Sequence, residues 1–184
     1  AYEISIRLVG SEICIRDRDR RVIEMRKDEI KNKILSEDPI KGSTFPLINR
    51  IGYTQMYRFG SPPNYNPKPE DSIEAMAKEK GVTAAELAYE ILIENDGNNF
   101  IYAPLVNYAD HTFGVCKKML DDKNAIMGLG DGGAHVGFIL DAGYPTWLIS
   151  YWSVKKKAYS MEETVRRLTS DTANAAGLLS LIHI

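Results

Sequence analysis

The first patterned segment of the chain lies between residues 19 and 36, where apolar and charged positions alternate. Its apolar residues recur at the three- and four-residue spacing of one helix face: Val22, Ile23, Met25, Ile30 and Ile34. Most of the other positions are charged, so the rest of the helix surface suits water. The spacing predicts a surface helix over residues 19–36.

A high density of proline ends this helical pattern between residues 37 and 70. Proline lacks a backbone N–H and clashes with the preceding turn, so a helix cannot persist there. At most one strand fits, near residues 53–59, within a long loop of the kind that usually forms a lid, a binding loop or an insertion. A linker between domains is the alternative. The segment has more aromatic residues than a solvated linker would carry: Phe45, Tyr53, Tyr57, Phe59 and Tyr65.

Capping residues mark three further helix starts. An N-cap side chain accepts a hydrogen bond from the unpaired backbone donors of the first turn. The predicted caps are Asp71, before a helix that stops at Gly81; Thr83, in a TxxE capping box with Glu86; and Ser160, in a second box with Glu163.

Two short apolar runs, residues 99–106 (NFIYAPLV) and 124–129 (NAIMGL), are typical of strands buried on both faces. A helical stretch over residues 111–120 separates them. The order helix–strand–helix–strand–helix implies parallel strands joined by right-handed crossovers. The pattern therefore predicts an α/β fold.

Composition and charge narrow the class of protein. The chain has 184 residues and a formal net charge of −2, which gives no electrostatic reason to expect a nucleic acid or an anionic membrane as partner. No apolar run reaches the roughly 18 residues that a membrane span needs. Cys14 and Cys116 lie far apart, without the spacing of a disulfide framework or a zinc knuckle. We expect a cytoplasmic protein from a reducing compartment.

Both ends of the chain resemble translated DNA rather than protein sequence. Residues 8–18 (LVGSEICIRDR) follow the in-frame translation of a transposon-end sequencing adapter except at Ile13, where the adapter encodes Met. Residues 1–3 resemble the outer part of the adapter, and residues 179–184 (LSLIHI) match its reverse complement. We therefore expect residues 1–18 and 179–184 not to be native. A genuine N-terminal strand, YEISIRLVG, is the alternative.

Candidate chemistry gathers where the two predicted strands end. The second strand runs into Gly128-Leu129-Gly130-Asp131-Gly132-Gly133-Ala134-His135, and the first into Asn107-Tyr108-Ala109-Asp110-His111. Parallel sheets and barrels deliver active-site residues at the carboxyl ends of strands, and glycines let a ligand or metal approach the backbone closely. The alternative is a tight strand-to-helix turn with a structural histidine.

A dinucleotide site is a weaker interpretation of the same glycines. Gly128, Gly130 and Gly133 fit GxGxxG. However, Asp131 would face the pyrophosphate with a negative charge, and no acidic residue follows about 20 positions later to bind a ribose.

Several strings together resemble the C-terminal barrel portion of N-acyl-D-amino-acid deacylases, the D-aminoacylase branch of the amidohydrolase superfamily. They are GLGDGGAHVG (128–137), DAGYPTWLISYW (141–152), MEETVRRLTSDTANAAGL (161–178), PNYNPKPEDSIEAMAKEKG (63–81) and LVNYAD (105–110). The likeness extends over most of residues 19–178. It implies that these residues are the last strands and helices of a (β/α)₈ barrel of the TIM type.

The resemblance also implies a zinc-dependent hydrolase that cleaves the amide bond of N-acyl-D-amino acids. Asp131 matches the aspartate that lies beside the metal and carries a proton from water to the leaving amine. Asn107, Tyr108, Gly132, Gly133 and His135 are then expected to contact the substrate. Cys116, in the middle of a predicted helix, is expected to pack rather than to bind metal.

The chain departs from the family pattern in what it lacks. It contains no HxH motif, and residues 19–178 fall short of the about 250 residues of a complete barrel. We therefore expect a fragment that is inactive by itself, with the other metal ligands outside it. A non-catalytic α/β binding module and another amidohydrolase, such as a dihydropyrimidinase-like or urea-type C–N hydrolase, remain alternatives. The oligomeric state is not predicted.

Overall fold

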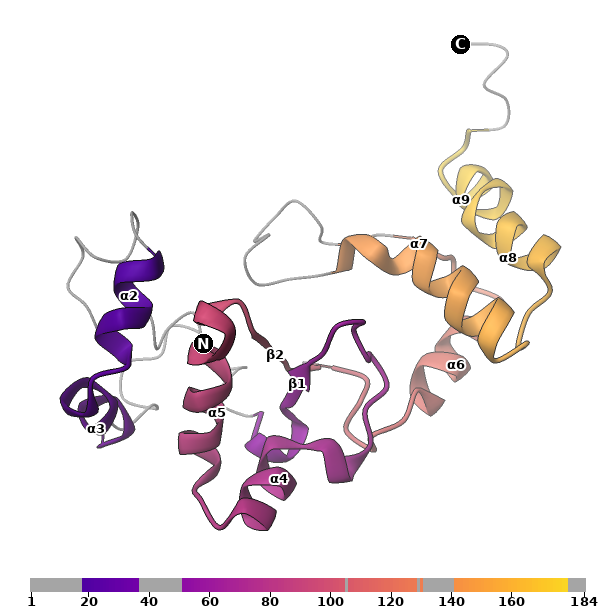
Figure 1. Ribbon diagram of the computed structural model, residues 1–184. Helices are drawn as coiled ribbons and strands as arrows, with labels where there is room; N and C mark the ends of the chain where they lie inside the picture. Colours follow the sequence, from indigo (N-terminus) through magenta and orange to yellow (C-terminus); the bar gives the residue numbers. More distant parts are fainter. Residues whose placement is uncertain (1–17, 37–50, 105, 129, 131–140, 179–184) are drawn as a thin grey trace. The chain divides into compact units, whose positions relative to one another are not determined.

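The computed structural model, drawn in Figure 1, describes residues 18–36, 51–104, 106–128, 130 and 141–178. The chain divides into two units, Ala1–Val115 and Cys116–Ile184. The described part combines many short helices with two strands, which confirms a mixed helix-and-strand chain. Within the described ranges, no helix combines the length and the apolar character that crossing a bilayer requires. The predicted non-native segments, residues 1–18 and 179–184, lie outside the described residues except for Arg18, which begins α2.

The predicted helix over residues 19–36 is two helices in the structure. Helix α2 (Arg18–Met25) ends in a turn in which Lys27 N–H donates to Glu24 O, and α3 (Asp28–Ser36) begins directly afterwards. Asp28 and Glu29 lie in the first turn of α3, where negative charge stabilises the exposed helix N-terminus. The apolar periodicity continues across the break, which explains why the pattern alone predicts one helix.

The remaining elements of the first unit form a helical hairpin beside a small sheet. They are the 3₁₀ turn η2 (Tyr53–Gln55), strand β1 (Tyr57–Phe59), the 3₁₀ turn η3 (Pro69–Asp71), helices α4 (Ile73–Lys80) and α5 (Ala84–Ile93), the turn η4 (Glu94–Gly97) and strand β2 (Phe100–Tyr102). The strand predicted near residues 53–59 is thus confirmed over its last three positions. The strand predicted over 99–106 is confirmed over 100–102.

The two strands pair antiparallel, in the register Tyr57↔Tyr102, Arg58↔Ile101 and Phe59↔Phe100. The predicted parallel arrangement concerned a different pair, residues 99–106 and 124–129, whereas the strand that pairs with 100–102 in the structure is β1. The second predicted strand, 124–129, is not a strand over its described residues. A turn at its start takes up backbone groups, because Ala125 N–H donates to Asp122 O and Asn124 N–H to the Asp122 carboxylate. An apolar run forms a strand only where a neighbouring strand completes its hydrogen bonds.

The core of the first unit lies between the α4–α5 hairpin and one face of the sheet. Ile73, Ala77, Leu87, Ala88 and Ile91 form this buried cluster, and Ile101 of β2 packs against it. The opposite face of the sheet is aromatic and carries Tyr57, Phe59, Phe100 and Tyr102.

Local capping signals are the best-predicted features of the chain. Thr83 Oγ1 accepts from Glu86 N–H at the start of α5, Ser160 Oγ accepts from Glu163 N–H at the start of α8 (Met161–Leu168), and Gly81 ends α4 at a φ of +70°. The predicted cap Asp71 is displaced by one residue. Ser72 caps α4 by accepting from Ala75 N–H, while the Asp71 carboxylate accepts from Lys68 N–H.

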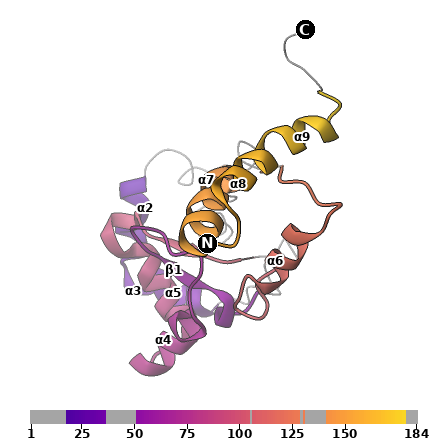
Figure 2. The same ribbon diagram turned by 90° about the vertical axis from the view of Figure 1, so that its right-hand side faces the viewer.

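The second unit is built from helices in its described part. Helix α6 (Gly114–Asp121), which begins at the boundary of the units, is followed by the turn η5 (Asp141–Gly143), α7 (Tyr144–Trp147), the π-helix η6 (Leu148–Lys155), α8 (Met161–Leu168) and α9 (Ser170–Ala175). The predicted helix over 111–120 therefore begins three residues later and ends one residue later. Figure 1 shows α7 continuing into η6 as one helical rod, which Figure 2 views close to its axis.

Candidate functional site

Asn107 and Tyr108, two of the residues predicted to contact substrate, lie in the first unit just beyond β2. Asn107 is exposed and adopts a left-handed backbone conformation with φ of +64°, which asparagine tolerates better than most residues. Tyr108 is only 2% exposed. Its hydroxyl donates to Pro67 O at 2.8 Å and lies 2.9 Å from Asn66 Oδ1, so it fastens the proline-rich loop to this segment.

A tyrosine–histidine pair that the sequence pattern does not indicate lies beside Tyr108. The hydroxyl of Tyr57, a residue 1% exposed in β1, lies 2.6 Å from His111 Nδ1. Burial raises the pKa of Tyr57, and the Asp71 carboxylate adds to the rise. The phenol therefore stays protonated at neutral pH and can donate to Nδ1 of a neutral imidazole. The pair joins residues 54 positions apart in sequence, and no local signal could have found it.

Asp110 is tied into the turn that precedes α6. Its carboxylate accepts from the Thr112 hydroxyl at 2.9 Å and from Thr112 N–H at 3.1 Å, and these two hydrogen bonds hold the pKa of Asp110 below its ordinary value. His111 has a left-handed backbone conformation with φ of +55°, which lies outside the α-helical region and explains why α6 begins after it, at Gly114.

The other predicted site residues belong to the second unit. Asp131, Gly132, Gly133 and His135 lie outside the described residues, so their predicted roles stay predictions. Asn107 and Tyr108 belong to the first unit. The described flanks of the glycine-rich segment are anchored within the second unit. On one side Met127 is 7% exposed and its carbonyl accepts from Thr172 Oγ1 at 2.8 Å, and on the other α7 begins at Tyr144.

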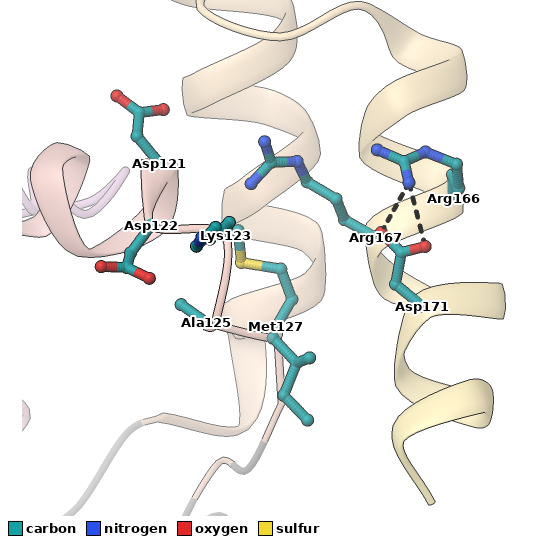
Figure 3. Close-up of a pocket in the computed structure, with 9 residues that line it drawn as sticks. Asp121, Asp122, Lys123, Ala125, Met127, Arg166, Arg167 and Asp171 are labelled. Atoms are coloured by element: carbon teal, nitrogen blue, oxygen red, sulfur yellow. Dashed lines mark hydrogen bonds and ion pairs between the residues drawn. The ribbon is translucent and has the colours of Figure 1, made fainter. Parts of the chain in front are cut away.

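A charged pocket of about 300 Å³ lies in the second unit, between the segment after α6 and helices α8 and α9 (Figure 3). Its lining residues are Asp121, Asp122, Lys123, Ala125, Ile126, Met127, Arg166, Arg167 and Asp171. Figure 3 shows the Arg166–Asp171 ion pair on one wall and Arg167 reaching toward the opposite one.

Most of the charged groups of this pocket already have partners. Arg167 donates to the Glu163 carboxylate and to Leu120 O, and its guanidinium lies over the Tyr159 ring. Asp121 accepts from Lys117 and from the Tyr159 hydroxyl, and these bonds lower the pKa of Asp121. The network holds α6 against α8, and we assign it a structural role.

A second hollow of about 210 Å³, here called the aromatic pocket, lies beside the charged one. Its lining residues are Leu120, Ile126, Met127, Gly128, Tyr144, Trp147, Leu148 and Trp152. In the sequence, Tyr144, Trp147 and Trp152 are distinguished only as members of the family-like string at 141–152. The helical spacing of the two tryptophans and Leu148 is the signal that could have suggested a shared apolar wall.

The described residues offer no zinc site by themselves. No group of three or more His, Cys, Asp and Glu side chains within the described ranges is arranged to hold a metal ion. Cys116 is half-buried on α6 and forms no disulfide. The zinc prediction therefore depends on Asp131 and on ligands from outside the described residues.

No protein-family model matches the chain, and no curated protein or solved structure matches it either.

Proposed function

We propose that residues 19–178 are the C-terminal part of the (β/α)₈ catalytic barrel of a zinc-dependent N-acyl-D-amino-acid deacylase. The observation that carries the proposal is the string GLGDGGAHVG at residues 128–137, which surrounds one carboxylate with glycines and adds an imidazole four residues later. The strings at 141–152 and 161–178 support it, because they follow in the order that the family shows.

The proposed roles follow from the chemistry of amide hydrolysis. Water must lose a proton as it attacks, and the amine must gain one as it leaves, so one carboxylate at hydrogen-bond distance can serve both steps. Asp131 is the proposed proton carrier. Zinc, when bound, polarises the scissile carbonyl and makes hydroxide available at neutral pH. The glycines around Asp131 leave space for the substrate, and Asn107, Tyr108, Gly132, Gly133 and His135 are the proposed substrate contacts.

The flanks of the glycine-rich segment are consistent with this role. Met127 is buried and held by Thr172, and α7 starts at Tyr144 with Pro145 in its first turn. Both described flanks therefore belong to the second unit.

The direct test is hydrolysis of N-acetyl-D-amino acids by a protein produced from the same gene with the sequence upstream of residue 19 included. We expect zinc-dependent release of the D-amino acid, no release from the L enantiomers, and loss of activity on chelation. A full-length protein that binds zinc and leaves all N-acyl-D-amino acids intact would contradict the proposal. Hydrolysis of a cyclic ureide in their place would favour the dihydropyrimidinase-like alternative.

A further inference from the structure

We propose that Tyr57 and His111 are positioning residues that fix the turn at residues 107–111 and thereby hold Asn107 for its contact with substrate. The inference rests on the proposed function, in which Asn107 is a substrate contact. Every residue that carries it belongs to the first unit and to the described part of the chain.

The backbone of the turn is left-handed at both of its ends. Asn107 and His111 have φ of +64° and +55°. Such a conformation costs free energy in any residue other than glycine, so it persists only where surrounding contacts hold it. Within the turn, His111 N–H donates to Tyr108 O at 3.0 Å. Further contacts reach the turn from a segment that is distant in sequence.

That segment is residues 55–67, which approaches the turn from the strand β1 and the proline-rich loop. The Gln55 side chain donates to Ala109 O at 3.3 Å. The Tyr108 hydroxyl donates to Pro67 O at 2.8 Å. These two hydrogen bonds hold the middle of the turn, and Tyr57 is left to hold its end.

The contact of Tyr57 with His111 has a defined donor. The Tyr57 hydroxyl lies 2.6 Å from His111 Nδ1, and the residue is only 1% exposed. It forms no other hydrogen bond with the part of the chain that the structure describes. Because a buried hydroxyl proton needs an acceptor, the phenol donates to Nδ1 of an imidazole that carries its own proton on Nε2. The His111 side chain is thereby fixed where the turn ends.

Asn107 is the residue that benefits from a rigid turn. It is exposed, and its side-chain amide offers donors and an acceptor that match the amide and carboxylate groups of an N-acyl amino acid. A contact that is held in place before binding costs no ordering when the ligand arrives. Loosening the turn should therefore raise KM and change kcat less, because Asn107 is assigned binding and not proton transfer.

Three variants isolate the hydrogen bond. Tyr57→Phe removes the hydroxyl and keeps the ring. His111→Gly and His111→Asn form a matched pair, because glycine and asparagine both tolerate the left-handed backbone of this position. Only asparagine has a side-chain oxygen at the δ position, where it can accept from Tyr57 as Nδ1 does. A loss that is seen in His111→Gly and recovered in His111→Asn therefore belongs to the hydrogen bond.

Amide hydrogen exchange of the 184-residue chain, measured by mass spectrometry, tests the turn without any substrate. We expect peptides that span residues 106–113 to exchange about tenfold faster in Tyr57→Phe and His111→Gly, and at about the parent rate in His111→Asn. Peptides from the α4–α5 hairpin are the internal control and should keep the parent rate. Unchanged exchange over 106–113, or equal acceleration in the hairpin, would overturn the proposal.

Steady-state kinetics of the full-length protein test whether Tyr57 acts through Asn107. With the N-acetyl-D-amino acid that the parent protein hydrolyses, we expect Tyr57→Phe and Asn107→Ala each to raise KM about fivefold or more, with kcat within about twofold. The double variant should have the KM of Asn107→Ala alone, because Tyr57 then has no contact left to position.

Additive effects on KM in the double variant, or a loss confined to kcat, would overturn the proposal, since a merely structural Tyr57 would act independently of Asn107. A parent protein that hydrolyses no N-acyl-D-amino acid would contradict the proposed function and with it the role of Asn107. The exchange experiment would still decide whether Tyr57 holds the turn.

Discussion

At the scale of single residues, burial decides which predicted roles the described structure favours. Tyr108 was expected to contact substrate, yet its ring is buried and its hydroxyl is engaged with the proline-rich loop. A side chain with that much contact supports the fold whether or not it also touches a ligand. Tyr57 supports the same region through His111. These two tyrosines therefore connect the loop, the sheet and the turn before α6.

Tyr108→Phe tests this structural role. Phenylalanine keeps the ring packing and removes the hydroxyl, which leaves Pro67 O without its donor. We expect the free energy of unfolding to fall by about 1–2 kcal/mol in urea titrations followed by circular dichroism. Tyr144→Phe is the control, since the Tyr144 hydroxyl has no hydrogen-bond partner among the described residues. If Tyr108→Phe is as stable as the parent chain, the hydrogen bond from the Tyr108 hydroxyl to Pro67 O contributes nothing to stability.

The stability of the second unit is expected to depend on pH through Asp121. Lys117 and the Tyr159 hydroxyl lower the pKa of Asp121 below its ordinary value. A carboxylate whose pKa is lower in the folded than in the unfolded state stabilises the fold above the unfolded pKa, and this contribution is lost as the pH falls through the folded value.

We therefore expect the melting temperature of the second unit, followed by tryptophan fluorescence, to fall as the pH drops below 3.8, the ordinary value for aspartate. Asp121→Asn should melt a few degrees lower at neutral pH and lose part of this acid sensitivity. An identical acid response in Asp121→Asn would mean that other carboxylates account for it.

At the scale of elements, features are predicted correctly from the sequence when the interacting groups are only a few residues apart, and less well when they are far apart in sequence. Thr83, Ser160 and Gly81 were predicted correctly because a cap depends on atoms within three or four residues. The register Tyr57↔Tyr102 joins residues that no turn signal connects, and the run at 124–129 has no described strand beside it. The apolar composition of this run could not reveal that a partner strand is lacking there. The apolar spacing does not indicate the break between α2 and α3, because the same spacing continues on both sides of the turn.

Ser160→Ala tests the cap of α8. Alanine leaves Glu163 N–H without its acceptor, and we expect a loss of about 1 kcal/mol in the free energy of unfolding of the second unit. Ser160→Asp restores an acceptor at the same position and should recover most of the stability. The tryptophan emission during urea unfolding measures both variants. A fully stable Ser160→Ala would mean that packing alone sets the start of α8.

At the scale of the whole molecule, the structure describes only part of the candidate site. Asn107 and Tyr108 are placed in one unit, while Asp131, Gly132, Gly133 and His135 lie outside the described residues. A (β/α)₈ barrel, the architecture proposed above, would be assembled from many strands that are distant in sequence, and no local pattern in this chain can specify it. Here the sequence predicts chemistry through a motif and leaves its geometry open.

The ligand count predicts how the chain behaves alone. One proposed metal-binding carboxylate cannot replace the three or four ligands of a protein zinc site. We expect the 184-residue chain to bind zinc no more tightly than micromolar in competition with a chromophoric chelator, and to hydrolyse no N-acetyl-D-amino acid. Zinc-dependent turnover by this chain alone would contradict the view that its metal ligands lie elsewhere.

The measurement that tests the central claim most directly is the kcat of Asp131→Asn in the full-length protein at saturating zinc. Asparagine keeps the shape and removes the proton acceptor, so the account predicts a fall in kcat of about 10²–10⁴-fold with an unchanged melting temperature. Asp122→Asn is the control, because it removes a carboxylate in the turn after α6, and it should keep the parent kcat. A kcat/KM of Asp131→Asn near that of the parent protein would contradict the assignment of Asp131 and, with it, the deacylase proposal.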